Sequence, residues 1–296
     1  MIPVLDWRRW RSDRAGFVAD LGRAARGPGF FVLAHHDIPE STVSETFAAA
    51  DRFFALPVDA KNAVARTADN RGYVGHGTEG LDDASGVKDR KEAFNIGLEL
   101  DADDPRMAEP FRGPNRWPDV AGFRETTLGY FDAAWKQGVA LQRAVALDLG
   151  LPHDHFDAAF SAPMATLRLL NYPAGDAGSV GAGAHTDYGA LTLLMTDGVG
   201  GLQVRPRGEA EWIDAPRVDG ALIVNIGDCL MRWTNDVYVS TPHRVVAPPA
   251  ARRSIAFFLD PNPEAEVAAL PGTGVPRYEA TTGADYLASR LNATYG

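Results

Sequence analysis

Two segments of the chain repeat apolar residues in steps of three and four, which is the spacing of one face of an α-helix. The first covers residues 43–54, and Thr42 with Glu45 predicts a capping box at its start. The second covers residues 128–149 and predicts a helix of roughly six turns. Gly150, a common residue type just beyond a helix end, predicts where this second helix ends.

From about residue 165 the pattern changes to short apolar runs separated by Gly, Pro and Asp. Several short strands at this spacing are typical of an all-β sandwich or barrel, and not of alternating strands and helices. We therefore expect a mainly β fold with flanking helices. The predicted strands cover residues 166–170, 191–195, 202–204, 221–226, 237–239 and 254–259.

The same change of pattern predicts how the chain is organised. A stretch rich in Pro, Asp and Gly at residues 101–118 predicts a long surface connection. We expect the helical and mixed N-terminal part to pack on the β core and to share its hydrophobic interior. The predicted divisions are an N-terminal region at 1–118, the long helix and a connection at 119–160, the β core at 161–264, and a C-terminal extension at 265–296 with a short helix near 286–293.

Composition narrows the range of partners. The 296 residues carry 29 Lys and Arg against 39 Asp and Glu, a net charge of −10, which disfavours binding to nucleic acid. No apolar run reaches the length of about 18 residues that a membrane helix needs, and the N-terminus lacks the pattern of a signal peptide. Cys229 is the single cysteine, which excludes an internal disulfide and any cysteine-built metal site. We expect a cytoplasmic protein with a small-molecule substrate and no membrane or nucleic-acid partner.

One group of side chains predicts metal chemistry. His185 and Asp187 are two positions apart, so on a strand they would point to the same face. If His243 comes from a neighbouring strand, two imidazoles and one carboxylate meet in the facial arrangement that suits ferrous iron and leaves coordination positions open. A bare His-x-Asp pattern is common, and the alternative is the polar face of a surface strand.

A second pair of polar residues follows His243. Arg252 and Ser254 enter an apolar strand and share one of its faces, so a guanidinium and a hydroxyl would point together into the barrel. A buried cation needs an anionic partner. The alternatives are a salt bridge from Arg252 to an acidic side chain, or exposure of Arg252 with Arg253 facing inward.

Together with the motifs around them, these residues resemble the iron(II)- and 2-oxoglutarate-dependent dioxygenases of the isopenicillin N synthase-like family. The resemblance covers nearly the whole chain and depends on the order of many short motifs. In the N-terminal part these are IPVLD at 2–6, GFFVL at 29–33, FF at 53–54, RGY at 71–73, KEAF at 91–94 and GPNRWP at 113–118. In the β core they are NYP at 171–173, HTD at 185–187, GLQV at 201–204, NIGD at 225–228, STPHRV at 240–245 and RRS at 252–254.

The resemblance implies a double-stranded β-helix, or jelly roll, with a metal site at its open end. It implies iron ligation by His185, Asp187 and His243, and binding of the distal carboxylate of 2-oxoglutarate by Arg252 and Ser254, with Tyr172 as a further hydrogen-bond partner. The implied reaction uses Fe(II), 2-oxoglutarate and molecular oxygen, with ascorbate as a reductant in vitro. It releases succinate and carbon dioxide while a small metabolite, as in secondary metabolism, is hydroxylated, desaturated, epoxidised or cyclised.

Four further residues are candidate substrate contacts. Phe258 shares a strand face with Ser254, and the alternative is plain core packing. Arg168 can face the barrel and meet an acidic substrate group, and the alternative is the surface. Tyr73 and Phe94 match N-terminal segments that lie over the site in the family.

Two other functions are compatible with the same residues. An iron(II) oxidase of the same fold would use no 2-oxoglutarate, and its Arg252 and Ser254 would bind a substrate carboxylate instead. A non-catalytic jelly roll would only bind a small molecule, since a fold does not fix a function. We expect a monomer or a weak homo-oligomer.

Overall fold

The computed structural model describes residues 1–78, 89–175, 180–247 and 250–295. The strands are β1 (Val4–Asp6), β2 (Phe30–Ala34), β3 (Gly72–Val74), β4 (Glu92–Gly97), β5 (Thr166–Tyr172), β6 (Val180–His185), β7 (Leu191–Thr196), β8 (Leu202–Val204), β9 (Ile213–Asp214), β10 (Leu222–Ile226), β11 (His243–Val246), β12 (Arg252–Leu259), β13 (Glu266–Val267) and β14 (Thr281–Thr282). The α-helices are α1 (Arg9–Ser12), α2 (Arg14–Arg26), α3 (Glu40–Phe54), α4 (Val58–Asn62), α5 (Phe123–Asp148), α6 (Asp228–Trp233) and α7 (Gly283–Tyr295), with 3-10 turns η1 (Pro105–Ala108) and η2 (Ala158–Phe160).

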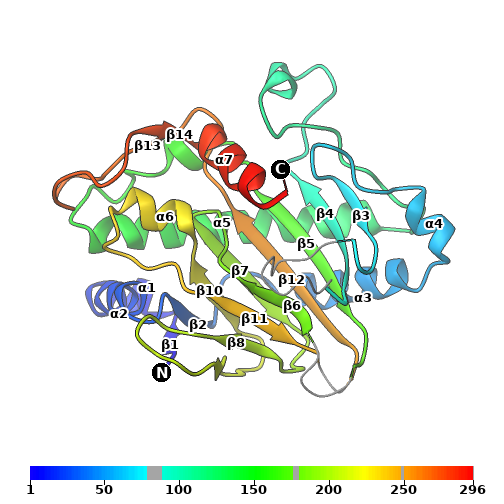
Figure 1. Ribbon diagram of the computed structural model, residues 1–296, viewed down its shortest axis with the longest axis horizontal. Helices are drawn as coiled ribbons and strands as arrows, with labels where there is room; N and C mark the ends of the chain where they lie inside the picture. Colours follow the sequence, from blue (N-terminus) through cyan, green and yellow to red (C-terminus); the bar gives the residue numbers. More distant parts are fainter. Residues whose placement is uncertain (79–88, 176–179, 248–249, 296) are drawn as a thin grey trace.

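Two β-sheets lie face to face and form the predicted jelly roll (Figure 1). The larger sheet has the strand order β1-β2-β10-β7-β12-β5-β4-β3, and the smaller has the order β6-β11-β8-β9. A cavity lined by residues of both sheets lies between them. The expectation of a mainly β fold with flanking helices is confirmed.

Strand β12 explains how the cavity and the core are separated, because alternate residues of a strand point to opposite faces. Positions 255, 257 and 259 are buried toward the helices, where the ring of Phe257 meets that of Phe131 edge-on at 5.1 Å. Positions 252, 254, 256 and 258 line the cavity. Both faces are covered, so the strand reads as one nearly continuous apolar run.

The two predicted helices are present as α3 and α5, which pack on each other behind the larger sheet. α5 ends at Asp148, and Gly150 beyond it has the left-handed φ of 72° that helix ends favour. The predicted capping box is wrong. α3 begins at Glu40 after Pro39, whose ring presets the backbone, so the helix starts about one turn earlier and Thr42 and Glu45 lie inside it.

The predicted strand at residues 237–239 is also wrong. Asn235 and Asp236 have left-handed backbone angles, with φ of 54° and 66°, and turn the chain after α6. Tyr238 is then fully buried, and its hydroxyl donates to the carboxylate of Asp148 at 2.6 Å. The apolar run is therefore buried as a connection, without strand pairing.

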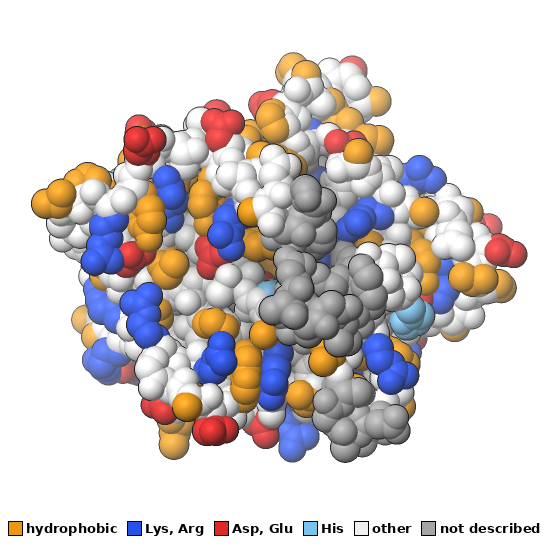
Figure 2. All heavy atoms as spheres, viewed as in Figure 1, with side chains coloured by type: hydrophobic (Ala, Val, Ile, Leu, Met, Phe, Trp, Pro, Cys, Tyr) orange, Lys and Arg blue, Asp and Glu red, His pale blue; other side chains and the backbone are white. Residues whose placement is uncertain are grey.

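The helices, the charged side chains on one face and the single cysteine bear on the expectations drawn from composition. None of the helices in the described ranges has the length and apolar character that crossing a membrane requires. On the face drawn in Figure 2, Lys and Arg side chains lie among Asp, Glu and apolar side chains, and not in one continuous basic patch. Cys229 is buried at the start of α6, and burial raises the pKa of its thiol.

Candidate metal centre and active-site cavity

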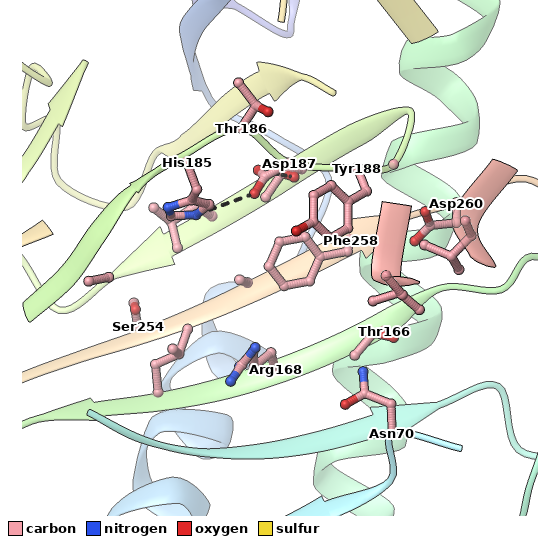
Figure 3. A pocket seen from close by; sticks show the side chains of 18 of the residues that line it. Asn70, Thr166, Arg168, His185, Thr186, Asp187, Tyr188, Ser254, Phe258 and Asp260 are labelled. Carbon is pink, nitrogen blue, oxygen red and sulfur yellow. Dashed lines mark hydrogen bonds and ion pairs between the residues drawn. The ribbon is translucent and has the colours of Figure 1, made fainter. Parts of the chain in front are cut away.

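His185, Asp187 and His243 line the same cavity. Figure 3 shows His185 and Asp187 facing each other on its wall. His185 ends β6 and His243 begins β11, and the two residues are directly opposite in the antiparallel pairing of these strands. One ligand atom from each of the three residues lies within 4.8 Å of the others. In the part of the chain that the structure describes, no other group of three His, Cys or carboxylate side chains is so arranged. We call these residues the metal-ligand triad.

Asp187 reaches the triad by a route that differs from the prediction. β6 ends at His185, so Asp187 lies in the turn beyond the strand and not two positions along it. The backbone N–H of Asp228 donates to the carbonyl of Asp187 at 2.7 Å and holds this turn against the start of α6. Gly227 permits the close approach, because a Cβ there would lie 2.1 Å from the carbonyl oxygen of Gly189.

Two hydrogen bonds fix the carboxylate of Asp187. Its Oδ2 accepts from the hydroxyl of Thr192 at 2.6 Å and from the side-chain amide of Asn225 at 2.8 Å. Its Oδ1 lies 3.7 Å from Nε2 of His185 and 3.6 Å from Nε2 of His243. The oxygen that those two donors leave free therefore faces both imidazoles, as a ligand to a shared cation would.

Each imidazole is fixed through its other ring nitrogen. Nδ1 of His185 lies 2.7 Å from the carbonyl oxygen of Gly183, and Nδ1 of His243 lies 3.2 Å from that of Thr241. A proton on Nδ1 that is donated to a carbonyl leaves the lone pair on Nε2 available for a metal. These Nε2 atoms are the ones that face Asp187.

Burial and pairing set the protonation of the triad. Burial lowers the pKa of His185 to about 4, and the nearby His243 adds to this effect. Burial alone would raise the pKa of Asp187, but His243 holds it below its usual range. Burial alone would lower the pKa of His243, but attraction to Asp187 raises it. A divalent cation would take the place of the His243 proton between one carboxylate and two imidazoles, a donor set that fits ferrous iron.

Arg252 faces the same cavity and is 1% exposed. Its Nη1 donates to the hydroxyl of Ser254 at 3.3 Å, and its guanidinium carbon lies 5.0 Å from the ring centroid of Tyr172. No carboxylate of the described residues forms an ion pair with it. Arg253 points to the other face and pairs with Asp51 at 2.8 Å, so both alternatives for Arg252 are excluded. A buried cation without a carboxylate partner suits an anionic ligand.

The cavity has a volume of about 460 Å³ and extends from the triad past Phe258. In Figure 3 the ring of Phe258 lies beside that of Tyr188, and Arg168 lines the same cavity from β5. We call this part of the cavity the outer compartment. It is formed by Asn70, Thr166, Arg168, Tyr188, Phe258, Asp260, Leu287 and Leu291.

Two polar groups of the outer compartment were not anticipated from the sequence. Asn70 accepts a hydrogen bond from Asn95 through Oδ1 at 2.7 Å, and Figure 3 shows its amide nitrogen directed toward the cavity. Asp260 is buried, and burial, with a smaller effect of Asp187, raises its pKa to about 7. Strand alternation beyond Phe258 could have identified Asp260. Asn70 lies in a connection without any periodic pattern.

Helix α7 forms one wall of the outer compartment and is longer than the helix predicted at 286–293. Arg290 of this helix pairs with the carboxylate of Asp228 at 2.8 Å. The same carboxylate oxygen accepts from the hydroxyl of Thr186 at 3.0 Å. The C-terminal helix is therefore attached to the turn that carries Asp187.

Tyr73 and Phe94 do not line the cavity among the described residues. The hydroxyl of Tyr73 donates to the buried carboxylate of Glu92 at 2.6 Å. Phe94 is fully buried and meets Phe53 with ring centroids 4.7 Å apart. Both side chains belong to an aromatic cluster of the core, so substrate contact by Tyr73 and Phe94 does not fit their positions.

Two family models match the chain. Residues 2–120 match the N-terminal region of the non-haem dioxygenases, described as "non-haem dioxygenase in morphine synthesis N-terminal". Residues 164–261 match the 2OG-Fe(II) oxygenase superfamily. The second match contains the metal-ligand triad as well as Arg252 and Ser254.

Curated proteins and solved structures are similar over nearly the full length. The 2-oxoglutarate-Fe(II) type oxidoreductase hxnY of Emericella nidulans is 34% identical, over 99% of this chain and 90% of its own. Validamycin A dioxygenase of Streptomyces hygroscopicus subsp. limoneus is 33% identical, over 93% and 82%. A full-length Neurospora crassa protein, crystallised in complex with alpha-KG and thymine, is 33% identical with a TM-score of 0.89, over 99% and 97%.

The geometry and the similarities agree. The chain is an oxidoreductase that uses Fe(II) and 2-oxoglutarate and couples decarboxylation of 2-oxoglutarate to oxidation of a small molecule. Neither the oxidase without 2-oxoglutarate nor the non-catalytic jelly roll is favoured. The chain belongs to the iron(II)- and 2-oxoglutarate-dependent dioxygenases of the isopenicillin N synthase-like group.

Proposed function

We propose that the metal-ligand triad holds Fe(II) and that Arg252, together with Ser254 and Tyr172, binds the distal carboxylate of 2-oxoglutarate. The observation that carries this assignment is a guanidinium that is 1% exposed, has no ion pair among the described residues, and shares a cavity with the triad. A carboxylate would neutralise this cation and accept hydrogen bonds from it. When bound, the iron supplies the activation of oxygen for the oxidative decarboxylation of 2-oxoglutarate.

We further propose that the substrate occupies the outer compartment and contacts Phe258 and Arg168. Both residues line the cavity beside the triad. Phe258 offers a flat apolar surface, and Arg168 offers donors to a carbonyl or carboxylate. The similar Neurospora crassa protein was crystallised with thymine, a small ring with two carbonyl groups. A compact ring compound with carbonyl acceptors therefore fits the groups of this compartment.

Three expectations from the sequence stay proposals. They are a cytoplasmic location, a monomeric or weakly associating chain without nucleic-acid or membrane partners, and the four divisions of the chain at 1–118, 119–160, 161–264 and 265–296. The net charge of −10 supports the absence of a nucleic-acid partner. Gel filtration across a range of protein concentrations tests the oligomeric state.

A pair of assays tests the assignment of the cavity. Anaerobic titration of the protein–Fe(II) complex with 2-oxoglutarate should give a visible metal-to-ligand absorption band. A panel of small ring compounds should then be tested for succinate release above the level without substrate, with Fe(II), oxygen and ascorbate present. Phe258→Ala should lose the stimulation by substrate and keep the absorption band. Absence of the band and of succinate under all conditions would contradict the proposal.

A further inference from the structure

Strand β6 carries His185 at the edge of the smaller sheet. Among the described strands it pairs with β11 alone. The register of that pairing shifts between His243 and Val245 and again between Val245 and Val246. Backbone pairing is therefore irregular in the residues next to His185, and the ladder alone does not fix the direction of this side chain.

A buried carboxylate holds this irregular edge. The backbone N–H of Gly183 donates to Oδ1 of Asp89 at 3.1 Å. The carbonyl oxygen of Gly183 lies 2.7 Å from Nδ1 of His185. Asp89 is 1% exposed, so water does not compete for this bond. One glycine residue thus connects the Asp89 carboxylate on one side to a member of the metal-ligand triad on the other.

Lys91 balances the charge of Asp89. Its ammonium group forms an ion pair with the Asp89 carboxylate, and the Lys91 side chain is 4% exposed. Removal of one member of a buried pair leaves an uncompensated charge, which is costly. The pair lies directly before the start of β4, and Lys91 also lines the cavity.

We propose that Asp89, with its charge balanced by Lys91, is a positioning residue for the iron site. It holds Gly183, and the carbonyl of Gly183 sets the ring direction and the proton position of His185. This inference rests on the proposed role of His185 as an iron ligand. Removal of a direct hydrogen-bond partner of a metal-bound imidazole typically changes metal affinity about 10–100-fold. Asp89 acts on His185 through Gly183, so we expect the lower end of this range.

Titration with Co(II), followed by visible absorption, tests the inference without turnover. Asp89→Ala removes the acceptor for Gly183, and Co(II) should bind about tenfold more weakly or worse. In the double variant Asp89→Asn with Lys91→Gln, the amide oxygen can still accept from Gly183 and both charges of this pair are removed. This neutral pair should restore Co(II) affinity close to that of the unmodified protein.

Glu92→Gln is the matched control. Glu92 also belongs to a buried ion pair, with Lys61 at 2.7 Å, and lies three positions beyond Asp89. Its hydrogen-bond partners Lys61, Tyr73 and Asn171 do not belong to β6. This variant should melt at a lower temperature and bind Co(II) with unchanged affinity.

Two outcomes would overturn the inference. One is normal Co(II) affinity in folded Asp89→Ala, and the other is an equal loss of affinity in Glu92→Gln. If Asp89→Ala does not fold, the double variant decides, because failure of the neutral pair to bind Co(II) also contradicts the inference.

His185→Ala separates the positioning role of Asp89 from the proposed role of His185 as an iron ligand. Unchanged affinity in His185→Ala defeats the ligand assignment, whereas a loss there without a loss in Asp89→Ala defeats only the positioning role.

Discussion

The metal centre and the outer compartment share one cavity, but the outer compartment adds a connection and a helix to residues of the strands. The triad and Arg252 lie on strands of the two sheets or directly beside them, and hydrogen bonds fix each side chain. The outer compartment takes three residues from strands β5 and β12, but it also includes Asn70 from a connection and two leucines from α7. Paired strands hold reacting groups in place, whereas connections and a separate helix can change without disturbing the sheets. We expect substitutions at the metal centre to change the binding of iron or 2-oxoglutarate, and substitutions in the outer compartment to change the binding of substrate.

Asp187→Ala should have the largest effect at the metal centre. It removes one of three proposed ligands, so Fe(II) retention and succinate release should both be abolished. The fold should remain, because the substitution leaves the residues of both hydrophobic clusters unchanged and costs only the acceptor of Thr192 and Asn225. Iron content after incubation with Fe(II), succinate release and a thermal melt test this prediction. A folded variant that retains iron would contradict the ligand assignment.

Arg252→Gln should weaken the binding of 2-oxoglutarate by about 2–5 kcal/mol, the usual loss when one partner of a buried charge pair is truncated. The absorption titration with 2-oxoglutarate measures the change. Arg253→Gln is the control, because Arg253 lies on the opposite strand face and pairs with Asp51. An equal effect of the two substitutions would show that charge alone, and not the position in the cavity, determines binding.

Asp260, in the outer compartment, should make the unfolding free energy of the protein depend on pH. Its pKa is raised from 3.8 to about 7, so the folded state binds this proton more tightly than the unfolded state. The contribution to stability is full below pH 3.8 and is lost as the pH rises through about 7. Between about pH 5 and pH 8 the metal-free protein should lose on the order of 2 kcal/mol of unfolding free energy from this group. Asp260→Asn should remove this pH-dependent loss of unfolding free energy. Urea unfolding of both proteins at the two pH values measures the difference.

Leu287→Ala should have the smallest effect. It removes apolar contact from the wall formed by α7 and should raise the substrate KM by a few-fold, equivalent to about 1 kcal/mol. The affinity for 2-oxoglutarate and the substrate-free release of succinate should not change. A parallel fall in 2-oxoglutarate affinity would mean that α7 also supports the metal centre. Substitutions in the outer compartment would then not act on substrate binding alone.

The sequence was sufficient for those cavity residues that lie on strands, at both ends of the cavity. Alternation predicted that Arg252 and Ser254 share a face and that Phe258 and Arg168 can face the barrel, and all four line the cavity. The spacing of His185 and Asp187 with His243 predicted a metal site, and the structure brings the triad together. The 2-oxoglutarate roles came from the order of the motifs. Asp187 reaches the triad from a turn, a detail that alternation could not anticipate.

The remaining errors have local physical causes. Pro39 presets the start of α3, so the polar residues that resembled a capping box lie within the helix. Left-handed Asn235 turns the chain before Tyr238, which is buried without joining a sheet. Asn70 comes from a connection and Leu287 from a distant helix, so no periodic pattern indicates that they meet. Tertiary packing, and not local spacing, determines where Asn70 and Leu287 lie.

The lone thiol described with the fold offers a measure of motion at the metal turn. The backbone N–H of Cys229 donates to the carbonyls of Tyr188 and Gly189 at 3.0 and 3.1 Å, directly after Asp187 in the chain. The sulfur is buried, so a thiol reagent reaches it only when the structure around it opens. Separation of the turn from α6 is one such opening, and a bound ion that holds Asp187 should therefore slow the labelling.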